Sequence, residues 1–273
     1  MNQLDTTPGS LNLLATLVSD LAAEQRSLDD VVAALDDQQW RRATASPGWT
    51  VADQLGHLTY FDAAAVTAIE RPEEFGPAAD ELLREALTTG LDDATLHSFR
   101  SLAPRAQLHA WRQRRDELEL AARSLREGAR VPWYGPPMGA KSFLSARLME
   151  TWAHGVDVRD ALGAPREASH RLRHVAQLGF NTRTWSYLVR GEQPPEGDVA
   201  LHLTGPDGAI WKWGDDAEDT IRGSAEEFCL VVTQRQHVAD TALETGDLGA
   251  HWLERAQAFA GAPSKGPAPR GEP

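Results

Sequence analysis

The sequence has little of what several classes of protein require. It contains one cysteine, Cys229, so it can form neither an intrachain disulfide nor a zinc site built from several cysteines. Its 27 Lys and Arg residues are outnumbered by 40 Asp and Glu residues, which gives a formal net charge of −13. Because an acidic surface repels phosphate, and no concentrated basic segment offsets it, we expect no binding to nucleic acid.

Long apolar runs are missing as well. No window of the sequence approaches the roughly 18 apolar residues that a membrane span requires. The first ten residues, MNQLDTTPGS, lack the basic start and apolar stretch of a secretory signal. We therefore expect a cytoplasmic protein without a membrane segment. The 273 residues, 41% of them hydrophobic, suffice for two ordinary domains with packed cores.

Residues 1–165 carry the pattern of a helical bundle. A first helix is predicted from the candidate N-cap Ser10 to about Leu35, because leucines recur in it every seven residues. Thr50 and Asp53 form a T-x-x-D capping signature, which predicts a second helix that reaches about residue 69.

Two further long helices are predicted over residues 104–125 and 141–162. The looser segment 72–91 predicts only a short helix over 80–87. The run 131–137 contains too many prolines and glycines to be helical. Four amphipathic helices with varied connections predict a four-helix bundle, which builds its sites from side chains on facing helices.

The remaining chain predicts a smaller α+β domain over residues 166–261. Its expected elements are a helix, a β-hairpin and two short helices, at 172–189, 199–213, 228–232 and 250–259. Ser224 and Glu227 predict a capping box before the first of the short helices. Residues 262–273, APSKGPAPRGEP, have the composition of a disordered tail. The overall fold class is therefore α+β.

The predicted helix over 141–162 holds a dense group of polar residues. Glu150 and His154 are four residues apart, so they lie on one helix face. A carboxylate on an inward face needs a partner, since a buried unpaired charge costs several kcal/mol. A divalent cation would supply it, and His57 on the second helix offers a third ligand. A His/Glu/His set leaves one position open, which is typical of catalytic zinc sites, although nickel, manganese or iron also fit.

Spacing alone leaves alternatives open for these residues. A lone histidine on an apolar face is more often a packed core residue, and Glu-x-x-x-His also occurs on solvated helices. Arg147 could form an i,i+3 ion pair with Glu150 on a wet face, or bind a ligand. Asp157 could orient the imidazole of His154.

Other candidates are weaker. Trp133, Tyr134 and Met138 precede the fourth helix, so they could line a pocket or simply pack. Cys229 lies in the apolar run 228–232, which favours a small core residue over a nucleophile.

Two stretches, 47–58 (PGWTVADQLGHL) and 150–157 (ETWAHGVD), resemble those of the DinB superfamily. More narrowly, they resemble the branch with mycothiol-dependent maleylpyruvate isomerase and mycothiol S-transferases. Within it, the chain is most similar to an actinobacterial group described only as metal-binding proteins. The likeness covers nearly the whole length, including residues 133–138 and 228–235.

The resemblance implies a metal triad at His57, Glu150 and His154. Many DinB members use three histidines, whereas Glu150 follows the isomerase-like variant. The family's second domain shapes the cleft over the metal, where basic residues hold an anionic ligand. In this chain Arg235, or less directly Arg222, is the candidate, although either could be a surface charge.

These features lead to one leading hypothesis and two alternatives. We expect a metal-dependent transferase or isomerase, with zinc as the favoured metal, that presents a low-molecular-weight thiol such as mycothiol to a small electrophile, as a monomer or homodimer. Metal coordination stabilises the thiolate, the nucleophilic form of sulfur. Asp157 and Arg235 are the expected catalytic residues, and Trp133, Tyr134, Met138 and Arg147 are expected around the bound thiol. The alternatives are a metal hydrolase or lyase that uses activated water, and a metal-binding protein without chemistry.

Overall fold

The structure is a computed structural model that describes residues 10–271, with side chains from Leu13 onward. The chain divides into two compact units, whose boundary falls between Pro165 and Arg166. The N-cap role predicted for Ser10 lies outside the described side chains.

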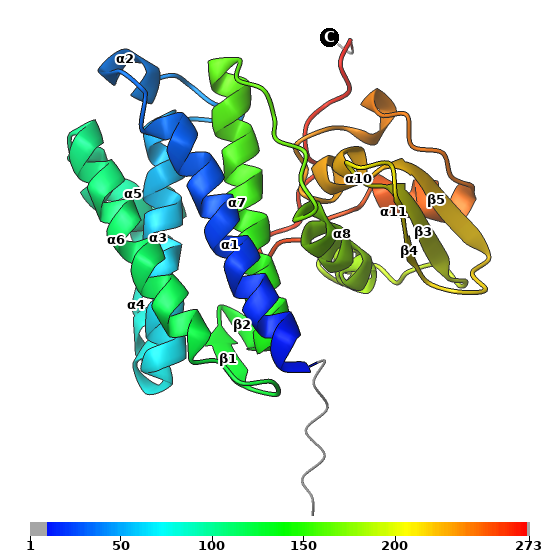
Figure 1. The fold of residues 1–273 in the computed structure, drawn as a ribbon, viewed down its shortest axis with the longest axis horizontal. Coiled ribbons are helices and arrows are strands. Elements are labelled where there is room, and N and C mark those ends of the chain that lie inside the picture. The colour runs from blue at the N-terminus through cyan, green and yellow to red at the C-terminus, as the bar shows by residue number, and fades with distance from the viewer. Residues whose placement is uncertain (1–9, 272–273) are drawn as a thin grey trace, which may run out of the picture. The chain divides into compact units, whose positions relative to one another are not determined.

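The first unit folds around four long helices that lie side by side (Figure 1). They are α1 (Ser10–Val32), α3 (Val51–Glu70), α6 (Pro104–Arg123) and α7 (Ala140–Leu162). Helices α1 and α3 each pack against both α6 and α7. The predicted four-helix bundle is confirmed, with helix ends that differ from prediction by a few residues.

Local chemistry sets the ends of the two helices that matter most for the site. At the start of α3, Thr50 Oγ1 accepts a hydrogen bond from the Asp53 backbone N–H, and Asp53 Oδ2 accepts one from the Thr50 N–H at 2.8 Å. This is the predicted capping box. Helix α7 ends at Leu162, and the next residue, Gly163, adopts a left-handed conformation (φ 66°) that favours glycine.

The bundle core contains the heptad residues of α1. Leu14, Leu21 and Leu28 are each at most 8% exposed, and from α6 the indole of Trp111 is fully buried. Leu35 lies past the end of α1 and packs against this core only in part. The predicted helix was therefore three residues too long.

The segment after α3 was predicted wrongly. It forms α4 (Pro72–Thr89) and α5 (Leu91–Arg100), where a short helix within a loose connection was expected. Pro72 occupies the first turn, where a backbone N–H has no helical partner, so it starts the helix rather than breaking it. Phe75 and Leu82 are buried, and α4 packs against α3 and α5. This packing holds the helix together despite Pro77 within it.

A β-hairpin precedes α7. Strands β1 (Arg130–Trp133) and β2 (Gly135–Gly139) pair antiparallel, so the prediction that this run is not helical is confirmed. Strand β1 contacts α3 and α4, and β2 contacts α7. A four-residue helix, α2 (Asp37–Trp40), lies between α1 and α3.

The second unit is built on a three-stranded sheet. Strand β3 (Val199–Thr204) is central, antiparallel to β4 (Ile210–Trp213) and parallel to β5 (Asp219–Ser224). The hairpin was predicted, but β5 was not. The remaining elements are helical: α8 (Leu172–Asn181), α9 (Arg183–Leu188), α10 (Ala225–Val232), the 3₁₀ helix η1 (Val238–Asp240) and α11 (Asp247–Leu253). The α+β class is confirmed.

Three details of this unit differ from what its sequence predicts. The helix predicted over 172–189 is broken at Thr182, and the helix predicted over 250–259 ends at Leu253. Ser224 does cap α10, by accepting hydrogen bonds from the backbone N–H groups of Glu226 and Glu227. The Glu227 carboxylate accepts from the Ala242 N–H, so it joins two segments rather than closing a capping box.

Residues 262–271 contain neither helix nor strand. Their backbone is nevertheless bonded to the second unit. Arg190 and Gln234 both donate to the carbonyl oxygen of Ser264, and the Arg270 N–H donates to the Asp240 carboxylate at 3.0 Å. The prediction of a disordered tail rests on composition, which does not reveal such tertiary bonds. Among the described residues, no helix is long and apolar enough to cross a membrane.

Candidate metal centre

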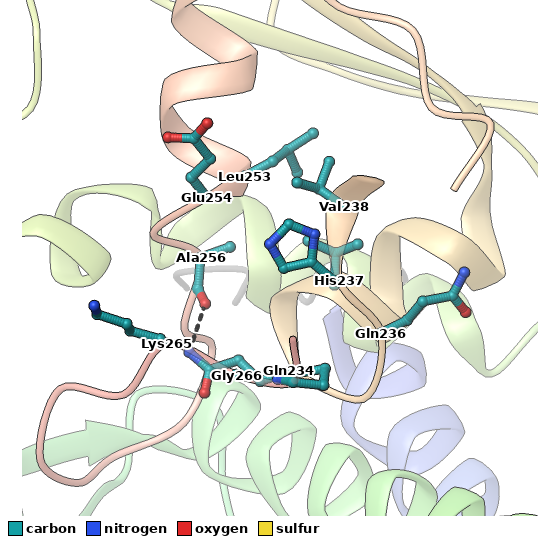
Figure 2. A pocket seen from close by; sticks show the side chains of 11 residues that line it. Gln234, Gln236, His237, Val238, Leu253, Glu254, Ala256, Lys265 and Gly266 are labelled. Atoms are coloured by element: carbon teal, nitrogen blue, oxygen red, sulfur yellow. Dashed lines mark hydrogen bonds between the residues drawn. The ribbon is translucent and has the colours of Figure 1, made fainter. Parts of the chain in front are cut away.

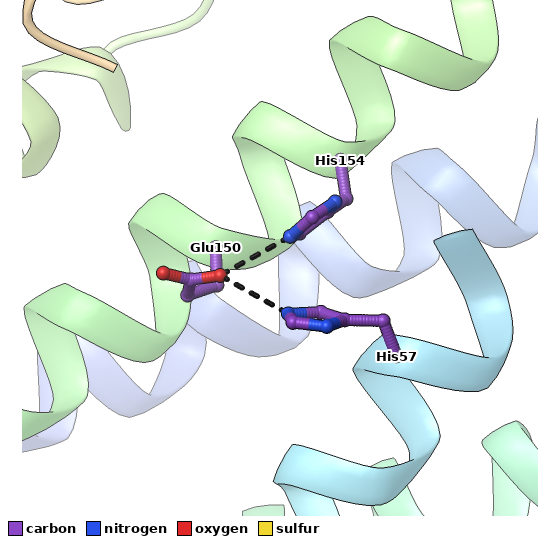
Figure 3. A group of neighbouring side chains, drawn as sticks. All are labelled: His57, Glu150 and His154. Carbon is purple, nitrogen blue, oxygen red and sulfur yellow. Dashed lines mark hydrogen bonds and ion pairs between the residues drawn. The ribbon is translucent and has the colours of Figure 1, made fainter. Parts of the chain in front are cut away.

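Three side chains from two helices meet inside the first unit (Figure 3). Glu150 Oε2 lies 3.2 Å from His154 Nε2 and 3.5 Å from His57 Nε2. One ligand atom from each residue lies within 4.8 Å of the other two. The sequence predicted that Glu150 and His154 share a face of α7, and the packing of α3 on α7 brings His57 to that face.

The spacing of these atoms fits a divalent ion. Zinc ligands lie about 2.0–2.1 Å from the ion, so two ligands in tetrahedral geometry are about 3.3 Å apart. The two nitrogen-to-oxygen distances at Glu150 bracket that value. Two imidazoles and one carboxylate are also the donor set of open, catalytic zinc sites.

The two histidines are held in different ways. His57 lies against aromatic rings, with ring centroids 4.6 Å from Phe61 and 5.2 Å from Trp49. The Trp49 indole also stacks on His154, and its N–H donates to Asp92 on α5 at 2.8 Å. The loop before α3 therefore contributes one wall of the site, which sequence spacing did not reveal.

His154 is held by a hydrogen bond to a neighbouring helix. Its Nδ1 lies 2.5 Å from Gln54 Oε1, on the side of the ring opposite Glu150. Asp157, which was expected to orient this imidazole, has its nearest oxygen 3.7 Å from the same nitrogen. Gln54 stands three residues before His57, which predicts a shared face of α3 but does not indicate its partner.

Burial and mutual contacts shift the pKa values of His57 and Glu150. Burial, together with the neighbouring His154, lowers the pKa of His57 to about 4. Burial alone would raise the pKa of Glu150, but the hydrogen bonds with His154 and His57 hold that pKa well below its usual range. Near neutral pH His57 is therefore neutral and Glu150 is ionised, which are the forms that bind a metal.

These shifts predict how the metal-free protein responds to acid. The unfolded chain protonates His57 near pH 6.5, whereas the folded protein does so only near pH 4. Between these values the unfolded state binds more protons, so stability falls as the pH falls. A lowering of this size corresponds to about 3 kcal/mol. Urea unfolding of the metal-free protein between pH 7 and pH 4 measures it.

The control for this measurement is His57→Phe, which removes the titrating group and keeps a ring among the aromatic neighbours. It should lose most of the stability change in that pH window. An unchanged slope in the variant would show that other groups cause the acid sensitivity.

Arg147 does not pair with Glu150 on a wet face. Its side chain is 4% exposed, and its Nη2 donates to Asp62 Oδ1 on α3 at 2.8 Å. The guanidinium also lies 5.9 Å from the ring centroid of Trp133. Burial raises the pKa of Asp62, and the guanidinium opposes that shift. The hypothesis of a solvated i,i+3 pair is therefore wrong, and Arg147 instead forms a buried ion pair with Asp62.

The hairpin residues differ in their surroundings. Trp133 stacks on Phe75 and meets Phe143 edge-on, while Tyr134 lies 5.6 Å from Phe61, the ring that contacts His57. These rings form one aromatic cluster that extends from the metal centre. Met138 pairs with Val131 across the hairpin and is half-buried.

In the second unit, the candidate basic residues make local contacts. Arg235 is partly buried and donates to the Thr233 carbonyl at 2.7 Å, and Arg222 is exposed. Cys229 is fully buried, and burial raises the pKa of its thiol well above the usual value, which agrees with a core residue. A small pocket beside Gln234 and His237 has a volume of about 20 Å³ (Figure 2), enough for one water rather than a substrate.

The fold and the site together define a class: a helical-bundle protein with a candidate His/Glu/His metal centre, followed by an α+β unit. Comparison with known families makes this specific. Residues 21–159 match the mycothiol maleylpyruvate isomerase N-terminal domain, so the chain belongs to that family.

The chain is also similar to known proteins, in sequence or in fold. The chain is 41% identical to an uncharacterized protein found in two strains of Mycobacterium tuberculosis, over 91% of this chain and 97% of that one. It is similar in fold to a crystal structure of the mycothiol-dependent maleylpyruvate isomerase, with a TM-score of 0.56, 17% identity and coverage of 85% of this chain and 92% of that one. A crystal structure of a mutant of that isomerase gives a TM-score of 0.54, at 18% identity and 81% and 89% coverage.

Proposed function

We propose that this protein is a metal-dependent transferase or isomerase that uses a low-molecular-weight thiol, of the mycothiol kind, on a small electrophilic substrate. The observation that carries the proposal is the convergence of two imidazole nitrogens on one carboxylate oxygen of Glu150. This convergence lies in the domain that defines a family named for a mycothiol-dependent isomerase.

In this proposal His57, Glu150 and His154 hold the ion, with zinc as the expected metal. A bound ion of this charge lowers the pKa of a thiol beside it, and so supplies the thiolate near neutral pH. The chain's own contribution is to keep the His57 imidazole neutral and to aim both imidazoles at one carboxylate oxygen. The surrounding rings of Trp49, Phe61 and Tyr134 provide apolar surface and limit the access of water.

The second unit and the hairpin have proposed roles in binding. Arg235 would hold an anionic group of the thiol or the substrate. Asp157, three residues after His154 on α7, would act as a catalytic residue beside the metal ligands. Trp133, Tyr134 and Met138 would contact the bound thiol or electrophile. Arg147 was expected around the bound thiol; because its side chain is buried against Asp62, we assign it a role in supporting the site.

A reaction screen tests this function. Purified protein is loaded with zinc and incubated with a thiol, mycothiol or a simpler analogue, and a panel of small electrophiles that includes cis-unsaturated keto acids. Mass spectrometry should detect adducts or isomerised products that require both metal and thiol. Turnover without thiol would indicate a hydrolase or lyase instead, and no metal-dependent product from any electrophile would contradict both enzyme hypotheses.

A further inference from the structure

We propose that Gln54 is a positioning residue that holds His154 in the one tautomer able to bind a metal through Nε2. The proposal rests on the metal site of the proposed function, and it concerns how the chain prepares that site. A chain of hydrogen-bond donors and acceptors runs from the loop before α3, through Gln54, to His154.

The orientation of the Gln54 amide is set by two hydroxyl groups. Thr44 Oγ1 donates its proton to the carbonyl oxygen of Trp49 at 3.2 Å, so towards Gln54 it can only accept. Gln54 Nε2 lies 2.8 Å from this hydroxyl oxygen and 3.1 Å from Ser46 Oγ. The amide nitrogen therefore faces the loop, and the amide oxygen faces His154.

The Gln54 amide oxygen then determines which nitrogen of His154 carries a proton. Gln54 Oε1 can only accept, so His154 Nδ1, at 2.5 Å, must carry the proton. A neutral imidazole has one N–H, which leaves a lone pair on Nε2. In that tautomer Nε2 is the nitrogen that can bind a metal, and it faces Glu150 Oε2, the proposed neighbouring ligand, at 3.2 Å.

No other described group is as well placed to perform this task. Asp157 Oδ2 is 3.7 Å from the same nitrogen, beyond hydrogen-bond distance. Gln54 is fully buried, so water cannot readily replace its amide oxygen if the side chain is shortened. Its loss would free the ring to place its proton on Nε2, where it blocks metal binding.

Two substitutions of Gln54 distinguish its role as a hydrogen-bond acceptor from its role in packing. Gln54→Leu removes the acceptor at similar size, and we expect zinc affinity, measured by competition with a chelator, to fall about 10- to 100-fold. Gln54→Glu restores an acceptor and should retain zinc affinity within a few-fold of wild type. The control is Gln107→Leu, which removes another buried glutamine, on α6, that bonds to the Phe99 carbonyl. It should leave zinc affinity unchanged.

A second readout needs no metal. Long-range ¹H–¹⁵N spectra of the metal-free protein report which imidazole nitrogen of His154 is protonated. We expect Nδ1–H in the wild type and in Gln54→Glu, and a mixture of tautomers or the Nε2–H form in Gln54→Leu.

The results that overturn the proposal are distinct from those that overturn the function. A folded Gln54→Leu variant with wild-type zinc affinity, or with the Nδ1–H tautomer intact, would show that Gln54 does not position His154. Equal loss in the Leu and Glu variants would assign the effect to packing or to the amide donors. If the wild type binds zinc but shows no thiol chemistry, the proposed function fails while this inference stands.

Discussion

The His154→Ala variant is expected to bind no divalent metal under conditions in which the wild-type protein binds one ion per chain. The substitution removes one of three ligands and leaves Glu150 with a single imidazole, from His57 at 3.5 Å. Two ligands cannot provide the three-residue set of catalytic zinc sites. Metal analysis after dialysis against dilute zinc, then against buffer, measures the content of each protein directly.

Stability provides a second measure of the same loss. A ligand at 100 times its dissociation constant stabilises a folded protein by about 2.7 kcal/mol. Zinc should therefore raise the unfolding temperature of the wild type and leave that of His154→Ala unchanged. The control is His109→Ala, an exposed histidine on α6, which should retain both metal and stabilisation. Equal metal content in wild type and His154→Ala would remove the proposed centre.

Breaking the buried ion pair between Arg147 and Asp62 is expected to have the largest effect on folding. The side chains of Arg147 and Asp62 are 4% and 1% exposed, and removing one partner leaves the other charge buried without compensation. Losses of this kind amount to about 3–5 kcal/mol. We expect Arg147→Met to lose stability of this order in urea unfolding. The double variant Arg147→Met with Asp62→Leu should recover much of it, because no buried charge remains.

An exposed ion pair with the same nitrogen-to-oxygen distance serves as the control. Arg71 and Glu74 are also 2.8 Å apart, but the two side chains are 47% and 58% exposed. Arg71→Met should change stability by a small fraction of the Arg147→Met effect, since water solvates the remaining carboxylate. Similar losses at both positions would mean that burial does not determine the energy of the Arg147 pair.

Those features of the fold that depend on neighbouring residues in the chain were predictable. Helix periodicity, the capping box at Thr50 and the stop at Gly163 involve contacts within a few residues, so the sequence reveals them directly. The predictions failed where distant packing decides the outcome. Helix α4 continues past Pro77 because Phe75 and Leu82 are buried, and β5 forms because it pairs with β3.

The candidate site divides in the same way. Helix geometry places Glu150 and His154 one turn apart on α7. The predicted helix over 51–69 offers His57 as a third ligand, and the resemblance to a known family implies the same three residues. Spacing does not reveal which side chains bond to His154 and Arg147, because the partner of each lies on another helix. Gln54, in place of Asp157, bonds to His154 across 100 positions of sequence, and Asp62, in place of Glu150, pairs with Arg147 across 85.

Sequence patterns thus account for the helices, for the helix face shared by Glu150 and His154, and for the family. Each of these arises from short-range geometry or from motifs carried along the chain. The approach of α3 to α7, the direction of the Gln54 amide and the burial of Arg147 arise only when distant segments pack. Hydrogen-bond partners and burial are properties of that packing. They determine which nitrogen carries a proton and whether a charge is solvated, and hence whether three residues can act as one metal centre.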